Sequence, residues 1–63
     1  MSDVLTFDDW NRAATKRICD NEDRDTARNV RAARKGLLAR ITLWDDYLAD
    51  CAAENRTPEA KQF

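Results

Sequence analysis

The chain has 63 residues, with 12 acidic and 11 basic side chains, no histidine and a net charge of −1. A chain of this length forms one small domain, which buries only about 60% of its unfolded surface. Small domains are commonly reinforced by disulfides, a metal or oligomerisation. The chain has two cysteines, Cys19 and Cys51, and no histidine, which argues against a metal centre. It also shows no cofactor motif. We therefore expect the domain to be stabilised by oligomerisation.

The composition predicts an all-α protein, with one glycine and one proline among many helix-forming residues. The chain shows neither the basic segment and apolar stretch of a signal peptide nor an apolar run of about 18 residues for a membrane span. We therefore expect a cytoplasmic protein with reduced thiols and no membrane contact.

A first helix is predicted over about residues 7–19. Thr6 is a suitable N-cap, and Asp8 and Asp9 place negative charge on the first turn. Leu5 precedes the cap and is expected to pack on Trp10 as a hydrophobic staple. Apolar residues then recur at helical spacing, at Phe7, Trp10, Ala14 and Ile18. We expect Phe7 and Trp10 to lie in the core.

Residues 20–23 are all polar and predict a tight turn before a second, longer helix. A seven-residue pattern predicts that helix over about residues 22–54, roughly 50 Å long if unbroken. Its two seam positions are Ala27, Arg34, Ile41 and Leu48, and Val30, Leu37, Trp44 and Cys51, with Arg34 as the charged interruption. The whole chain, residues 1–63, is then a single helical hairpin domain with frayed ends at about 1–5 and 56–63.

Gly36 offers an alternative to the long helix. The sequence Arg34-Lys35-Gly36 is typical of a helix C-terminus, with basic residues followed by glycine. A break there gives three short helices. A continuous helix would accept the glycine at a cost of about 1 kcal/mol.

The length difference between the two helices predicts a homodimer. The short helix reaches only the first part of the long one, so apolar residues farther along need another partner. We expect the dimer interface to contain Leu37, Leu38, Ile41, Trp44, Leu48 and Cys51. An antiparallel arrangement is favoured because it places Arg28 and Arg31 near Asp50 and Glu54 of the second copy.

Two groups of residues are candidates for binding a partner. Four basic residues at spacings of four, three and four form a stripe, at Arg24, Arg28, Arg31 and Lys35. The simpler interpretation is a solvated helix face. Leu43 and Tyr47 are candidate anchors, since aromatic residues are enriched among binding hot spots. The simpler interpretation there is a place in the core.

These features predict a small non-enzymatic protein-binding module that docks on a larger protein, as a phage or bacterial inhibitor or anti-activator does. The chain has no histidine base and no glycine-rich phosphate loop, so we expect no catalytic site. The alternative is a nucleic-acid-binding helical protein that uses the basic stripe. The near-zero net charge argues against that alternative.

Overall fold

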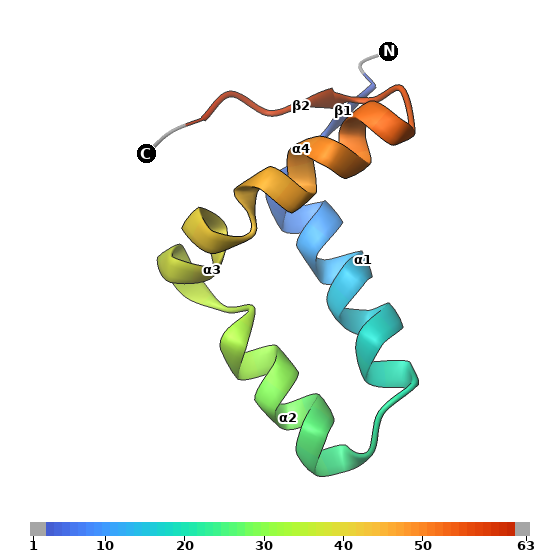
Figure 1. Cartoon of the computed structure of the whole chain (residues 1–63), viewed down its shortest axis with the longest axis vertical. Helices are drawn as coiled ribbons and strands as arrows, with labels where there is room; N and C mark the ends of the chain where they lie inside the picture. Colours follow the sequence, from blue (N-terminus) through green and yellow to red (C-terminus); the bar gives the residue numbers. More distant parts are fainter. Residues whose placement is uncertain (1–2, 62–63) are drawn as a thin grey trace.

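A computed structural model describes residues 3–61, which form four helices and two very short strands (Figure 1). The all-α prediction is confirmed. In chain order the elements are β1 (Val4–Leu5), α1 (Phe7–Asp20), α2 (Arg24–Ala33), α3 (Gly36–Thr42), α4 (Trp44–Ala53) and β2 (Thr57–Pro58).

Helix α1 agrees with the prediction at both ends. The Thr6 side chain accepts a hydrogen bond from the Asp9 backbone N–H at 3.2 Å, which satisfies a free N–H of the first turn. The turn after α1 also lies where the polar residues predicted it. Asp23 caps α2 there, and its carboxylate accepts from the Thr26 N–H at 2.7 Å.

The continuous second helix is wrong, because the chain breaks at two points (Figure 1). Helix α2 ends at Ala33, and Gly36 has a φ of +81°, a conformation that glycine adopts without steric cost. The alternative break at Gly36 is therefore the observed one. A second break at Leu43, between α3 and α4, was not predicted. The seven-residue pattern thus spans three helices and forms no single seam.

The largest side chains gather where α4 meets the beginning of α1. The rings of Trp44 and Tyr47 lie 4.9 Å apart, and those of Phe7 and Trp10 lie 5.4 Å apart. All four rings are buried, at 0–7% exposed, and aromatic side chains contribute large apolar areas to a core. We call this group the aromatic core, and it consists of Leu5, Phe7, Trp10, Trp44, Tyr47 and Cys51. The predicted core positions of Phe7 and Trp10 are confirmed.

The two segments predicted to fray contain a parallel strand pair. Val4 pairs with Thr57 and Leu5 with Pro58. The Tyr47 hydroxyl donates to the Leu5 carbonyl and accepts from the Glu59 N–H, so one buried side chain ties both segments to α4. Its burial raises the pKa of Tyr47 above the usual value. The outer residues of the predicted frayed ends, 1–2 and 62–63, lie outside the described part of the chain.

Candidate functional site

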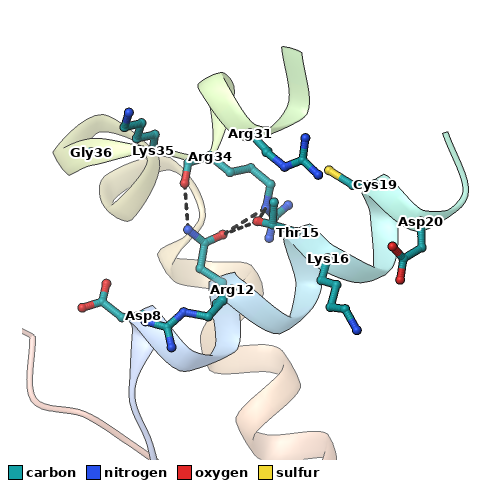
Figure 2. Close-up of a pocket in the computed structure, with 11 residues that line it drawn as sticks. Asp8, Arg12, Thr15, Lys16, Cys19, Asp20, Arg31, Arg34, Lys35 and Gly36 are labelled. Carbon is teal, nitrogen blue, oxygen red and sulfur yellow. Dashed lines mark hydrogen bonds between the residues drawn. The ribbon is translucent and has the colours of Figure 1, made fainter. Parts of the chain in front are cut away.

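A cleft of about 570 Å³ lies between α1 and the end of α2 (Figure 2). Helix α1 contributes residues one turn apart along one face, from Asp8 in its first turn to Asp20 at its end. The opposite wall consists of Arg31, Arg34, Lys35 and Gly36. The side chains of Arg31 and Arg34 reach from α2 toward α1 (Figure 2). We call this site the cationic cleft.

Arg34 is held in one geometry at the centre of this cleft. Its Nε donates to Asn11 Oδ1 at 3.0 Å and to Thr15 Oγ1 at 3.1 Å. Asn11 Nδ2 donates back to the Arg34 carbonyl at 2.8 Å, which satisfies the exposed end of α2. The guanidinium also lies 5.4 Å from the centre of the Trp10 ring. These contacts fix the side chain, and no hydrogen bond from its terminal nitrogens occurs within residues 3–61.

Asn11 was missed by the sequence analysis. The available signal in the sequence was Arg34, a charged residue at an apolar position of the seven-residue pattern. A charged side chain in that position needs a polar partner on a neighbouring helix. That signal pointed to Arg34 but could not select Asn11 from the other polar residues of α1.

The ion pairs within residues 3–61 leave most cations of this cleft without an acidic partner. Arg40 pairs with Glu59 at 3.0 Å and with Asp8 at 3.8 Å, and Arg12 approaches Asp9 at 3.9 Å. Four lysines and arginines of the cleft have no acidic partner within residues 3–61, namely Lys16, Arg31, Arg34 and Lys35. The cleft therefore presents positive charge to an incoming group.

The predicted basic stripe is divided between two places. Arg24, Arg28 and Arg31 are exposed on α2, but Lys35 follows the end of that helix at the N-cap position of α3. Only Arg31 and Lys35 line the cationic cleft. The break before Gly36 thus removes Lys35 from the helix face on which the spacing had placed it.

Helix α3 exposes an apolar surface beside the cleft. The exposed fractions are 62% for Leu37, 73% for Leu38 and 50% for Ile41, all within a helix of seven residues. Their spacing places them within about 100° of one another around the helix. We call these three residues the α3 face. Gly36 connects the two surfaces, because it lines the cleft and begins α3.

The residues of the predicted dimer interface also lie in different parts of the structure. Trp44 and Cys51 belong to the aromatic core of their own chain, because α4 begins anew at Trp44 and turns that face toward α1. Leu48 is 36% exposed on α4. Among the predicted interface residues, Leu48 and the three residues of the α3 face expose apolar surface to solvent.

The two predicted anchors, Leu43 and Tyr47, do not form a surface. Tyr47 is fully buried, so its side chain lies inside the molecule rather than on a partner-facing side. Leu43 is partly buried and packs against the aromatic core. The simpler interpretation, a place in the core, fits Tyr47.

Reactive groups are few in the described residues. Cys19 and Cys51 are buried free thiols, and Cys19 Sγ lies 3.5 Å from the Ala27 carbonyl oxygen. Residues 3–61 contain no cluster of histidine, cysteine and acidic side chains that could hold a metal ion. Within the same residues no helix has the length and apolarity to cross a bilayer. The chain matches no protein-family model, no curated protein and no solved structure.

Proposed function

We propose that this chain is a non-enzymatic module that docks on a larger protein through the α3 face. The observation that carries the proposal is the exposure of Leu37, Leu38 and Ile41 on one short helix. Scattered apolar residues are normal on a protein surface, but three on one helix face form a patch of the kind that marks interaction sites. An apolar helix face of this kind fits a groove on a partner.

The surroundings of the α3 face indicate the chemistry of that partner. Lys35 precedes the face, and Arg31 and Arg34 line the cleft on the same side of Gly36. None of these three cations has an acidic partner in the described residues. An apolar groove with acidic residues at its rim would complement both features, and rim charges of opposite sign speed encounter.

A larger partner fits this face better than a second copy does. A stable interface uses roughly 20–30 residues a side, whereas the α3 face supplies three. A few well-placed apolar residues suffice when they enter a preformed pocket, since hot spots carry most binding energy. The antiparallel homodimer remains the competing outcome.

A module that docks but catalyses no reaction acts by covering part of the partner's surface. We propose an inhibitor or anti-activator role on that basis, of the kind found in phage and bacterial accessory proteins. Both cysteines are free thiols, which supports a cytoplasmic place of action.

Site-specific photo-crosslinking in cells tests the docking proposal. A crosslinking amino acid replaces Leu38 in one variant and Ala52, exposed on α4, in a matched control. We expect an adduct with one larger protein from position 38 and none from position 52. Excess natural chain should abolish the adduct, whereas a chain carrying Leu37→Ser and Ile41→Ser should not.

Two results would overturn the proposal. One is an adduct at position 38 with the mass of two copies of the chain, which would indicate a homodimer. The other is equal labelling of the same proteins from both positions, which would indicate non-specific contact. Light scattering on the purified chain, about 7.3 kDa per copy, separates monomer from dimer independently.

A further inference from the structure

The cationic cleft has the geometry of a ligand site in its own right. Its volume of 570 Å³ lies within the range of about 300–1,000 Å³ typical of small-molecule sites. Its walls are polar or charged except at Cys19 and Gly36. The cleft therefore suits a polar ligand, and the unpaired cations require that ligand to be an anion.

Arg34 identifies the kind of anion. Its guanidinium is planar, and the bonds from Nε to Asn11 and Thr15 fix the plane while leaving the terminal nitrogens unbonded within residues 3–61. Such a fork matches two oxygens of a carboxylate or phosphate group. Arg31 lies one helical turn earlier and reaches toward the same wall of α1 (Figure 2). Two arginines and two lysines around one cleft favour a doubly charged group over a single carboxylate.

The ends of the cleft limit the size of the ligand. Asp8 and Asp20 stand at the two ends of the lining face of α1, about 18 Å apart along the helix. A duplex backbone lying along the cleft would present a phosphate about every 3.4 Å on each strand. Some of those phosphates would then meet the two carboxylates. A compact anion placed between them avoids both carboxylates.

We propose that the cationic cleft binds a small phosphate-bearing molecule, a phosphate monoester or diphosphate, with Arg34 and Arg31 as its principal ligands. Lys35 and Lys16 lie at the margins of the same cleft and add positive charge there. The site shares Arg31, Arg34 and Lys35 with the surroundings of the α3 face, but it does not include Leu37, Leu38 or Ile41, so phosphate binding by the isolated chain tests it apart from docking.

The test is a titration of the ¹⁵N-labelled chain with pyrophosphate and inorganic phosphate, followed by NMR. Ionic strength is held constant with sodium chloride, because screening alone shifts surface signals. We expect saturable shifts at the Arg34 Nε–H and the Gly36 amide, with pyrophosphate binding more tightly than phosphate. The Nε–H is a suitable reporter since Asn11 and Thr15 hold it in place.

Two double variants with the same net charge separate a site from general attraction. Arg31→Gln with Lys35→Gln removes two cations of the cleft, whereas Arg24→Gln with Arg28→Gln removes two exposed cations outside it. All four side chains are exposed, so both variants should fold. We expect the first pair to weaken pyrophosphate binding at least tenfold and the second pair to change it less than twofold.

Four results would overturn the proposal. Equal weakening by both pairs would show charge attraction without a site. Succinate binding as tightly as pyrophosphate would show a site for carboxylates instead. Binding of a 12-base-pair DNA duplex more tightly than pyrophosphate, lost with Arg24→Gln and Arg28→Gln, would restore the nucleic-acid alternative. Shifts that never saturate would likewise exclude a built site.

Discussion

At the end of the molecule where α4 meets the first turn of α1, four aromatic rings pack together, whereas between α1 and α2 the buried residues are alanines and a cysteine. We call these regions the aromatic end and the cationic end. The aromatic end also holds the strand pair and its hydrogen bonds to Tyr47. The cationic end holds Lys16, Arg31, Arg34 and Lys35, which have no acidic partner within residues 3–61.

This difference suggests separate roles, with the aromatic end stabilising the fold and the cationic end available for binding. Burial of large rings supplies most of the apolar stabilisation, so the aromatic end can hold the fold together. The cationic end buries little and leaves its charges unneutralised, which is unfavourable for a helix by a few tenths of a kcal/mol per like-charged pair. Such a surface is better explained by a ligand or partner than by folding.

The largest effect is expected from Trp44→Ala in the aromatic end. Trp44 is 7% exposed, and removing a buried aromatic side chain costs about 3–5 kcal/mol. A domain of this size has a total stability of roughly 3–9 kcal/mol, so the variant should lose about half or more of its stability. Urea denaturation followed by circular dichroism measures the change.

Leu38→Ala is the matched control, because Leu38 is 73% exposed. It should change the free energy of unfolding by less than about 0.5 kcal/mol. Equal losses from the two variants would place Leu38 in an interface that stabilises the protein, and would revive the homodimer.

Tyr47→Phe should give the next largest effect. It leaves the ring in the core but removes the hydroxyl that bonds to the Leu5 carbonyl and the Glu59 N–H. A buried group left without its partner costs about 1–3 kcal/mol, so the free energy of unfolding should fall by that amount. The same urea denaturation measures it. A loss below about 0.5 kcal/mol would show that water replaces these bonds.

The same tyrosine predicts a loss of stability in alkali. Burial raises the folded-state pKa of Tyr47 above the usual value of 10.0. Its contribution is therefore fully present below that value and is lost as pH rises through the higher folded-state pKa. The difference between the natural chain and Tyr47→Phe should shrink above about pH 10. A difference that stays constant from neutral pH upward would contradict this assignment.

Gly36→Ala tests the junction between α2 and α3. A side chain at φ +81° is strained even though nothing lies within 4 Å of the added Cβ. We expect a loss of about 1–2 kcal/mol, whereas a continuous helix would gain stability from alanine. Thermal unfolding measures the sign. Asn55→Gly is the control, since Asn55 also has a positive φ, of 55°, and glycine there should cause little change.

These positions show which parts of the fold could be predicted from the sequence. The start of α1 was predictable because Thr6, the acidic first turn and the apolar spacing all act within a few residues. The break at Gly36 was foreseen only as an alternative. Local preference alone could not settle it, because the bond from Asn11 to the Arg34 carbonyl that stabilises the break crosses between helices.

The candidate sites were harder to predict for the same reason. For Tyr47 the sequence left both a surface anchor and a core position open, and the choice depends on the break at Leu43, which turns α4 onto α1. The strand pair joins residues more than 50 positions apart, and two-residue strands carry no repeating pattern. Exposure of the α3 face likewise follows from where the helices break. Arg31 and Lys35 were identified as basic candidates, but the cleft that they share with Arg34 required tertiary structure.

The smallest expected effect concerns Asp23, the N-cap of α2 in the cationic end. Hydrogen bonds from the Thr26 backbone N–H and hydroxyl hold the pKa of Asp23 below its usual value of 3.8. A lowered folded-state pKa means that the stabilisation is present above 3.8 and is lost as pH falls through the lower value.

Asp23→Asn keeps a good capping side chain but cannot titrate. We therefore expect the natural chain to lose its advantage over the variant as the pH falls below 3.8. Because Asp23 is exposed, this change should appear less in global unfolding than in faster amide hydrogen exchange at Thr26 and Ala27, which bond to Asp23. If exchange at these two amides responds to acid equally in both chains, the charge of Asp23 does not stabilise α2. Helix α2 would then be stabilised by its contacts with α1 and not by the charge at its N-cap.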